Sequence, residues 1–420
     1  MKINQFSVRL ESAPSRVVIR PFHIASSAGD TVRGKRIVKA VTAMAQDECA
    51  RLLEIVNADF SARHWQTREV FLNRYNHVAE QYGLSDQLSE LQRELIGAYF
   101  CHEYSYAAAA ITNPSIVRHI DQSGLRPGDQ RFIMSLRTVG EGHISSIAFR
   151  EGILAADGEL SLWPQPELSI AATSEDPTPV DNVVAHRPPT VPISGMVMFP
   201  FTAAQRNGLE DLRLTRFQED NGEITYYGTY TAYSGVGISS ELLITKDFDT
   251  FELKAMQGAA AGNKGMALFP RRINGAYAMI GRQDGESVYF LQSDDLLRWD
   301  NGVLLLAPKY PWELVQIGNC GAPIELDEGW LLLTHGVGAV RKYSLGAALL
   351  DKKDPRKVLG RLPEPFLVPS SENRSGYVPN VLYTCGALKH GNALFLPYGV
   401  ADSSVSFAML DLPSLLAEMH

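Results

Sequence analysis

An acidic pair followed closely by an arginine is the strongest chemical signal in this sequence. Glu210 and Asp211 lie in the segment GLEDLR, which ends at Arg213 and stands between two runs typical of β-strands. Adjacent carboxylates repel each other, which costs stability unless a site uses the pair. A buried carboxyl group whose pKa is raised by such a neighbour can protonate a leaving group. Alone, the pair also fits a surface turn with an incidental ion pair.

Further charged and polar residues recur at the ends of predicted first strands or in the loops before them. Each of them, taken singly, is more often a solvated or structural residue. Their placement at the same point of successive repeats instead favours one shared site. The residues are Arg137, Asp211, Arg213, Lys264, Arg282, His335 and Asp402.

The sequence predicts no metal site and no nucleotide-binding loop. His102 with Glu103, and His119 with Asp121, lack the ligand spacing and the third partner that a catalytic zinc needs. The glycine-rich run over 258–265 lacks the Gly-Lys-Ser/Thr ending of a P-loop and is interpreted as a flexible rim that carries Lys264. We therefore expect neither a metal nor an organic cofactor.

A β-rich unit recurs five times beyond residue 125, each copy with a strand, a turn, a second strand and often an acidic turn. The copies begin at Arg131, Ile224, Gly275, Gly329 and Asn392. Units of roughly 50 residues that each supply a small sheet are typical of β-propellers. The sequence thus predicts an all-β catalytic domain over 111–420, a five-bladed β-propeller. A Pro-rich insertion over 163–192 is expected to be a lid or a rim loop without a regular strand.

The first 110 residues have a different pattern and are predicted to form an N-terminal α-helical extension. Apolar residues recur at three- and four-residue spacing over 43–56 and 65–82, which is typical of amphipathic helices. A third helix is predicted to start at Ser85, with that serine as its cap. We expect this extension to dock on the larger domain or on another subunit, which makes it the candidate region for a homo-oligomer.

Composition excludes several classes of function. The 420 residues include 39 basic and 47 acidic ones, a formal charge of -8, and no basic stripe that would bind nucleic acid. The start lacks the apolar core of a secretory signal, and no run is long enough to span a bilayer, so a cytoplasmic protein without membrane contact is expected. The cysteines are widely spaced, which predicts buried thiols at Cys49, Cys101, Cys320 and Cys385.

Six segments of the chain resemble glycoside hydrolase family 130, the β-mannoside phosphorylases and β-mannosidases built on a five-bladed propeller. The resemblance covers about residues 110–415. The chain differs from the family at Leu212, where Pro is usual, and at Gly265, where many members have a polar residue. The segments are NPS at 113–115, GLEDLR at 208–213, NKGMALFPRRINGAY from 263, IGNCGAPIELDEGWLLLTHGV from 317, YSLGAALLDKKDPRKVLGR from 343, and GYVPNVLYTCG followed by PYGVADSSVSFA.

The resemblance implies roles for individual residues. Asp211 matches the proton donor, in a family thought to pass the proton to the glycosidic oxygen through a hydroxyl of the mannose. Glu210 and Arg213 flank it and are assigned to substrate binding. The positions that match sugar contacts are Asn113, Tyr343, Pro379, Asn380 and Asp402. For Asp402 a turn-stabilising role is an equal alternative.

The choice between hydrolysis and phosphorolysis depends on the remaining groups. An inverting hydrolase needs a second carboxylate to activate water, for which Glu141 or Glu210 is available. A phosphorylase needs cations that gather phosphate, which is itself the nucleophile. The candidates for phosphate binding are Arg137, Lys264, Arg282 and His335, with Tyr343 as a hydroxyl donor.

These cations favour an inverting β-mannoside phosphorylase. It would take a β-linked mannosyl oligosaccharide and inorganic phosphate and release α-mannose 1-phosphate. An inverting β-mannosidase that uses the same site is the first alternative, and a non-catalytic sugar-binding propeller is the second.

Overall fold

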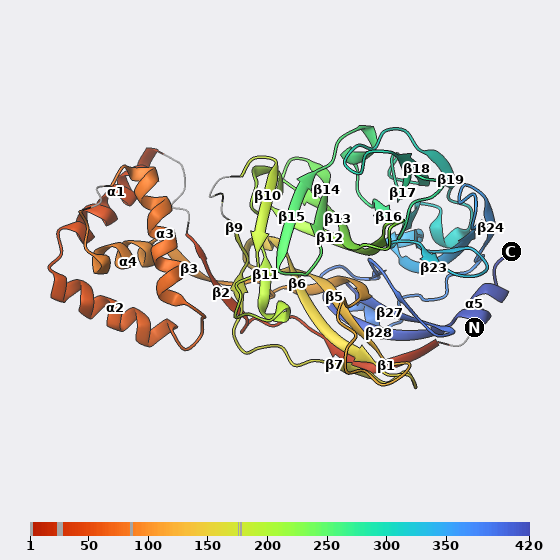
Figure 1. The fold of residues 1–420 in the computed structure, drawn as a ribbon, viewed down its shortest axis with the longest axis horizontal. Helices are drawn as coiled ribbons and strands as arrows, with labels where there is room; N and C mark the ends of the chain where they lie inside the picture. The colour runs from red at the N-terminus through yellow and green to blue at the C-terminus, as the bar shows by residue number, and fades with distance from the viewer. Residues whose placement is uncertain (1–2, 23–27, 85–86, 175, 177–178) are drawn as a thin grey trace. The chain divides into compact units, whose positions relative to one another are not determined.

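The computed structural model describes residues 3–22, 28–84, 87–174, 176 and 179–420, and the chain divides into two compact units (Figure 1). The β-rich unit comprises Met1–Ala13, Ala107–Gln165 and Ala172–His420, and the helical unit comprises Pro14–Tyr106 and Pro166–Ala171. All the candidate site residues named above fall in the β-rich unit. Among the described residues, no helix has the length and apolar character needed to cross a membrane.

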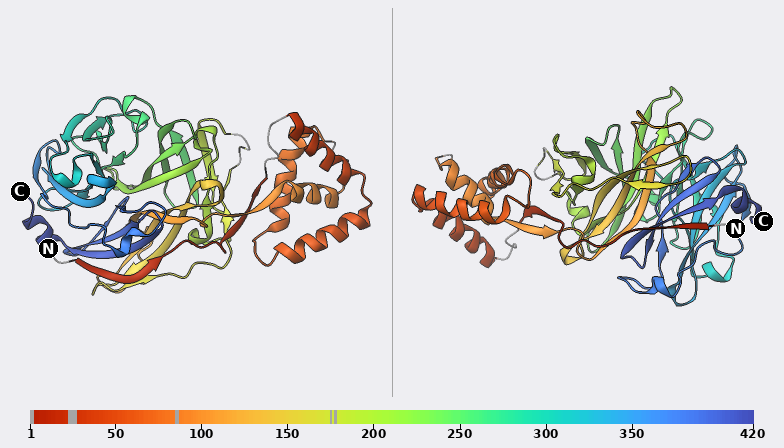
Figure 2. Two further views of the ribbon diagram at one scale, coloured as in Figure 1. Left: turned by 180° about the vertical axis from the view of Figure 1, so that it is seen from behind. Right: turned by 90° about the horizontal axis from the view of Figure 1, so that it is seen from below.

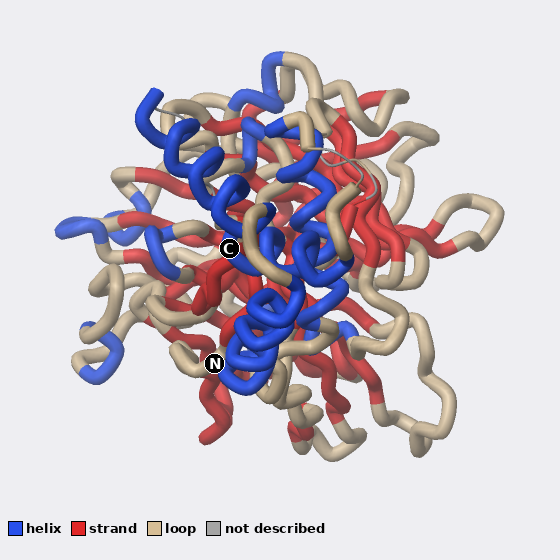
Figure 3. The backbone as a smooth tube through the Cα atoms, turned by 90° about the vertical axis from the view of Figure 1, so that its left-hand side faces the viewer, coloured by secondary structure: helices blue, strands red, loops and turns tan. Residues whose placement is uncertain are grey.

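In its described residues, the helical unit contains four helices and a two-stranded antiparallel sheet (helices blue, strands red in Figure 3). Its core consists of apolar residues from all four helices, among them Val41, Cys49, Val78 and Leu95. The helices predicted over 43–56 and 65–82 correspond to α2 and α3. The elements are β2 (Val17–Pro21), α1 (Ala28–Thr42), α2 (Gln46–Phe60), α3 (Thr67–Tyr82), α4 (Glu90–Tyr99) and β3 (Cys101–Ser105), followed much later by the short β8 (Ile170–Ala171).

The start of α4 differs from the predicted one. Ser85 lies outside the described residues, and the helix is capped by Ser89. The Gln92 backbone N–H donates to Ser89 Oγ at 3.2 Å, while Gln92 Oε1 accepts from the Ser89 backbone N–H at 3.1 Å. This reciprocal pair satisfies two backbone donors that a helix start otherwise leaves free.

Among the described residues, the strands of the β-rich unit form one large sheet and three smaller antiparallel sheets, which agrees with the predicted all-β class. The large sheet consists of two antiparallel groups joined by one parallel pairing, Gly208 of β12 with Ser145 of β6, so that five groups can be distinguished. The first group is β4 (Ala110–Arg118), β5 (Gln130–Val139), β6 (Ser145–Leu154) and β7 (Leu160–Leu162), with β11 (Met196–Met198) on β6. The second is β12 (Gly208–Gln218), β13 (Ile224–Tyr233), β14 (Ile238–Thr245) and β15 (Thr250–Ala255), extended by β10 (Asn182–His186) and β9 (Thr173–Ser174). The third is β16 (Ala267–Leu268), β17 (Tyr277–Gly281), β18 (Val288–Ser293) and β19 (Val303–Leu306). The fourth is β20 (Gln316–Asn319), β21 (Ile324–Glu325), β22 (Trp330–Val337), β23 (Tyr343–Leu350) and β24 (Val358–Arg361). The fifth is β25 (Leu382–Tyr383), β26 (Leu388–His390), β27 (Ala393–Val400) and β28 (Ser404–Asp411), joined by β1 (Ile3–Leu10) and followed by α5 (Leu412–Ala417).

The first strand of the chain belongs to the last group. Strand β1 pairs antiparallel with β28, from Ile3 opposite Leu410 to Leu10 opposite Val405. Figures 1 and 2 show this red strand running beside the blue β28. The sequence predicts residues 3–10 as part of the helical extension, because their pattern does not reveal a partner strand near the other end of the chain. The pairing puts them in the β-rich unit.

The Pro-rich insertion is not purely a loop. Its residues Asn182–His186 form β10, which pairs antiparallel with β15 along the whole strand. Val183 and Ala185 are buried, whereas Asn182 and Val184, which alternate with them, are exposed. This period-two alternation is that of a sheet strand with one buried face, and it was obscured by the prolines on either side.

Buried apolar clusters connect each group of strands to the next. One joins the first and second groups, another the second and third, and so on to the fourth and fifth. A further cluster joins the fifth group back to the first, with Phe132 and Met134 from β5 against Phe395 and Phe407 from β27 and β28. The Phe395 and Phe407 rings are stacked, with centroids 5.8 Å apart, and the Phe132 ring lies 5.8 Å from that of Phe395.

Candidate active site

A β-bulge places Glu210 and Asp211 on the same side of their strand. The pairing of β12 with β13 shifts register between Glu210 and Arg213, and Asp211 has a left-handed φ of 56°. Neighbouring side chains in a regular strand point to opposite faces, and an extra bulged residue breaks that alternation. Arg137 of β5 consequently reaches both acids, with Nη2 2.8 Å from Glu210 Oε1 and Nη1 3.1 Å from Asp211 Oδ1.

A second bulge brings Asn113 to the same carboxyl group. The β4–β5 pairing shifts register between Thr112 and Ser115, and Asn113 has a φ of 48°. Its Nδ2 donates to Asp211 Oδ1 at 2.5 Å. Thr112 Oγ1 lies 2.9 Å from Asn113 Oδ1 and 3.3 Å from Asp402 Oδ1. Asn113 thus contacts Asp211 directly, and Thr112 connects Asn113 to Asp402.

Arg213 lies buried behind Asp211 and donates hydrogen bonds to the protein around it. It is only 2% exposed, and its Nη1 donates to the backbone oxygen of Asp211 at 3.1 Å. Its Nε donates to the Cys320 backbone oxygen at 2.9 Å, and its Nη2 donates to Tyr383 Oη at 2.7 Å. All three contacts are with protein acceptors, and the predicted contact of Arg213 with substrate stays a prediction.

Tyr383 was missed as a site residue. It lies in the matching segment GYVPNVLYTCG, but its spacing gave no sign that the phenol would meet Arg213. Its ring also packs edge-on against His335, with centroids 4.9 Å apart. Tyr383 therefore connects the arginine behind Asp211 to the predicted phosphate-binding residues.

The predicted phosphate-binding residues lie in series, with Arg137 and Lys264 joined through Glu210, and Arg282 beside Gly265, which follows Lys264. Lys264 Nζ lies 2.9 Å from Glu210 Oε2, so Glu210 bridges Lys264 and Arg137. Gly265 has a φ of 91°, and a Cβ placed there would lie 2.6 Å from Arg282 Nε. Glycine at this position, where many family members have a polar residue, thus leaves the space that Arg282 occupies.

His335 completes this series as a neutral imidazole. Burial, and then the charges of Arg282 and Arg213, hold the pKa of His335 well below its usual range. Arg282 Nη1 therefore donates to the unprotonated His335 Nε2 at 3.3 Å. The ring of Tyr343 stacks on His335, with centroids 5.8 Å apart and planes at 10°. The sequence predicts four potentially cationic groups that include His335. The buried His335 ring is neutral, so Arg137, Lys264 and Arg282 are the permanent cations among the four.

The ionisation of Asp211 differs from the expectation that burial and Glu210 would raise its pKa. Burial acts in that direction, but the charges of Arg137, Arg213 and Lys264 and the hydrogen bond from Asn113 outweigh it, so the pKa of Asp211 lies below its usual range. Asp211 is thus a carboxylate at neutral pH when no ligand is bound. The raised pKa belongs to Asp402, mainly because of burial, with Arg137 opposing and Asp211 adding to the increase.

The remaining sugar-contact candidates lie on a loop beside Asp402. The Tyr343 backbone N–H donates to the Asn380 carbonyl oxygen at 2.9 Å. The Val378 N–H donates to the Ala401 oxygen at 2.9 Å, which fixes the loop next to Asp402. Asn380 is half-buried and Pro379 is exposed. The loop therefore carries both residues to the edge of the cluster, with Pro379 facing outward.

Four of the candidate residues share an uncommon backbone conformation. Asn113, Asp211, Asn380 and Asp402 have φ values between 48° and 63°. Asn and Asp adopt the left-handed region more readily than other L-residues, but the conformation still carries strain. Such strain concentrates where a fold must aim a side chain precisely. The pattern supports a functional role for all four.

Val340 carries the same strain without an evident use for its side chain. It has a φ of 57° in the turn between β22 and β23 and is 91% exposed. A β-branched residue is disfavoured there by about 1–2 kcal/mol. We expect Val340→Gly to raise the free energy of unfolding by about 1 kcal/mol, measured by urea denaturation, after allowing for the entropy of the added glycine. Val303→Gly, at an exposed strand position with ordinary φ, should instead lower it.

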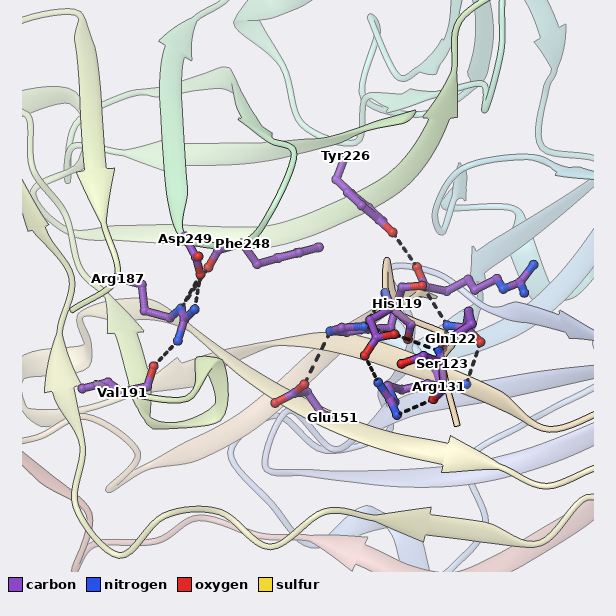
Figure 4. A network of polar contacts seen from close by, with 12 residues as sticks. His119, Gln122, Ser123, Arg131, Glu151, Arg187, Val191, Tyr226, Phe248 and Asp249 are labelled. Atoms are coloured by element: carbon purple, nitrogen blue, oxygen red, sulfur yellow. Dashed lines mark hydrogen bonds and ion pairs between the residues drawn. The ribbon is translucent and has the colours of Figure 1, made fainter. Parts of the chain in front are cut away.

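A second network of hydrogen bonds and ion pairs lies at the opposite end of β4 and holds neighbouring strands and turns together (Figure 4). His119 follows β4, about 20 Å along the strand from Asn113. His119 Nε2 lies 3.6 Å from Glu151 Oε1, and Asp121 pairs with Arg131 at 2.5 Å. Among the described residues, no group of three or more His, Cys, Asp or Glu side chains could hold a metal. His119 and Asp121 are engaged in this local network.

Comparison with known proteins supports the assignment that these residues suggested. Residues 194–419 match a family model described as beta-1,4-mannooligosaccharide phosphorylase. The chain is 33% identical to the Beta-1,2-mannobiose phosphorylase of Listeria innocua over 230 residues, which are 53% of this chain and 63% of the relative. It is 33% identical to the 1,2-beta-oligomannan phosphorylase of Thermoanaerobacter sp. over 225 residues, which are 52% of this chain and 73% of the relative. The chain thus spans less than two thirds of the length of the Listeria relative.

Solved structures agree in fold. The Beta-1,2-Mannobiose phosphorylase from Listeria innocua, in complex with beta-1,2-mannobiose, superposes with a TM-score of 0.53 at 23% identity over 74% of this chain and 92% of that one. A structure from work on GH130 glycoside hydrolases that target beta-1,2 mannosidic linkages in Candida mannan superposes with a TM-score of 0.55 at 19% identity, over 74% of this chain and 86% of that one. The chain therefore belongs to glycoside hydrolase family 130, a family of enzymes that act on mannosides.

Proposed function

We propose that this protein is an inverting β-mannoside phosphorylase with Asp211 as its proton donor. It takes a β-linked mannosyl oligosaccharide and inorganic phosphate and releases α-mannose 1-phosphate and a shortened sugar. The curated relatives, which are named as phosphorylases of β-mannosides, support this class of reaction. We also propose that the enzyme is cytoplasmic, that it needs no metal or organic cofactor, and that its helical unit assembles a homo-oligomer.

We further propose that the five groups of strands close into a five-bladed propeller. The support is the series of apolar clusters between consecutive groups, together with the cluster that joins the fifth group to the first. The pairing of β1 with β28 adds a strand from the start of the chain to the last group. A ring of this kind brings residues from distant segments to one pocket, as Asn113, Asp211 and Asp402 require.

The observation that best supports phosphorolysis is a pair of salt bridges. Glu210 pairs with both Arg137 and Lys264, directly beside Asp211. An inverting hydrolase needs a free carboxylate opposite its acid. Glu210 has both oxygens held by cations, and Glu141 is exposed in the turn Glu141–His143. The three cations Arg137, Lys264 and Arg282 outnumber the acidic pair Glu210 and Asp211, and this excess of positive charge suits a phosphate nucleophile.

Phosphate would also prepare the proton donor. A phosphate dianion near Arg137, Lys264 and Arg282 offsets the positive charge that keeps the pKa of Asp211 low. The pKa of Asp211 then rises, and the carboxyl group can hold the proton that the leaving oxygen needs. The glycosidic C–O bond breaks as a phosphate oxygen bonds to the anomeric carbon from the opposite face, and the leaving oxygen receives the Asp211 proton through a mannose hydroxyl. This order gives inversion and couples acid catalysis to occupancy of the phosphate site.

The decisive test supplies the purified protein with β-1,2- or β-1,4-mannobiose, each with and without phosphate. We expect α-mannose 1-phosphate and mannose only when phosphate is present. Equal release of mannose in both conditions, without the phosphate ester, would show a β-mannosidase. Binding of mannobiose with no product in either condition would show a sugar-binding propeller.

A further inference from the structure

An exposed aromatic pair spans two loops of the β-rich unit. Tyr377 Oη lies 2.9 Å from His143 Nδ1, and the two rings lie 5.7 Å apart at 36°. Tyr377 is 50% exposed. The sequence assigned no role to either residue, and they are 234 positions apart. Their contact connects the β5–β6 turn of the first group to the segment before β25 of the fifth.

Both members of the pair are attached to the active-site cluster. His143 lies in the turn Glu141–His143, whose flanking strands carry Arg137 and Ser145, and Arg137 Nε donates to Ser145 Oγ at 2.9 Å. The Tyr377 backbone N–H donates to Ser403 Oγ at 2.5 Å, next to Asp402. Tyr377 also precedes the sugar-contact candidate Asn380 by three residues. The pair therefore lies at the boundary of the site.

The backbone under this pair is constrained on both sides. Gly142 and His143 have φ values of 67° and 60°, and only the glycine adopts this region without strain. On the other loop, a Cβ on Gly376 would lie 2.6 Å from Ala401 Cβ and Ser403 Oγ, so the loop packs closely on the residues around Asp402. The His143 conformation directs its ring onto Tyr377, where the hydrogen bond and the ring contact hold the two loops together.

We propose that Tyr377, braced by His143, is the platform for the leaving-side sugar, the pyranose that is released from the β-mannoside. This inference rests on the proposed function. The buried residues Asn113 and Asp211 are available to the transferred mannose, and the next sugar of the chain must lie toward solvent. A pyranose presents an apolar C–H face on one side of its ring, which packs on an exposed tyrosine ring.

The synthetic direction of the reaction tests the platform, because donor and acceptor sugars are then separate substrates. With α-mannose 1-phosphate as donor and mannose as acceptor, we expect Tyr377→Ala to raise the KM for the acceptor roughly tenfold. The KM for α-mannose 1-phosphate should stay within about twofold of the wild-type value. Tyr377→Phe keeps the ring and loses only the bond to His143, so its effect should be smaller.

Each outcome decides the matter. An unchanged acceptor KM in Tyr377→Ala would overturn the platform, and so would an equal rise in both KM values, which indicates a bracing role for the loops. Tyr99→Ala, at a tyrosine of 45% exposure in the helical unit, is the control and should leave both KM values unchanged.

A binding measurement separates failure of the platform from failure of the proposed function. If the wild type shows no phosphate-dependent turnover, the proposed function fails, and calorimetry with β-mannobiose and methyl β-mannoside still tests the platform. We expect the wild type to bind the disaccharide more tightly than the monosaccharide, and Tyr377→Ala to lose that preference. Equal affinity of the wild type for the two ligands would overturn the platform.

Discussion

Replacing Asp211 with asparagine should reduce phosphorolysis by about 10²–10⁴-fold, the range typical for loss of a general acid. The substitution keeps the shape of the side chain and an oxygen that can accept the 2.5 Å hydrogen bond from Asn113. It removes the group that can carry the proton. Binding of β-mannobiose, measured by calorimetry, should therefore change only a few-fold, while the initial rate of α-mannose 1-phosphate formation falls.

Two matched variants make this result specific. Asp249→Asn removes another carboxylate that is paired with an arginine, Arg187, outside the cluster, and should leave the rate unchanged. Asp402→Asn tests the rival donor, because Asp402 is the carboxyl group whose pKa is raised. A larger loss of rate in Asp402→Asn than in Asp211→Asn would transfer the role of proton donor to Asp402.

The residues of the candidate site could be named from the sequence, because the chemistry that marks them is local. The acidic pair, the cations at the repeat ends and the matching segments name residues that the structure brings into one series of contacts, from Asn113 through Asp211 to His335. Strand alternation and turn residues also located most of the repeats. These signals depend on a few neighbouring residues, so they can be recognised without knowledge of the fold.

Ionisation states could not be predicted in this way. The pKa of Asp211 depends on three cations from separate segments and on the hydrogen bond from Asn113. No sequence pattern marked the two bulges that place Asp211 and Asn113. The same holds for His335, whose burial beside Arg282 keeps its ring neutral. Both corrections arise from long-range packing. The sequence did not predict strands β1 and β10 for a similar reason, because each pairs with a strand far away in the chain.

Arg137 is the residue whose loss should have the widest effect. It neutralises Glu210 and Asp211 together, and its side chain is 22% exposed. Removing one partner of a largely buried ion pair leaves the other charge uncompensated and costs about 3–5 kcal/mol. We expect Arg137→Met to lower the free energy of unfolding at pH 7 by roughly the lower figure and to weaken phosphate binding, seen as a higher KM for phosphate.

The pH dependence of this loss has a definite sign. Arg137 helps hold the folded-state pKa of Asp211 below its unfolded value of about 3.9. The stabilisation from this pairing is therefore fully present above that unfolded value and is lost as the pH falls toward the lower folded value. The difference in stability between the wild type and Arg137→Met should be largest near neutral pH and should shrink below about pH 4. Arg126→Met removes an exposed arginine from its ion pair with Asp129 and should change stability little at any of these pH values. A wild-type-to-variant difference that does not vary with pH would mean that Arg137 stabilises the fold by packing, and that the low pKa of Asp211 has another source.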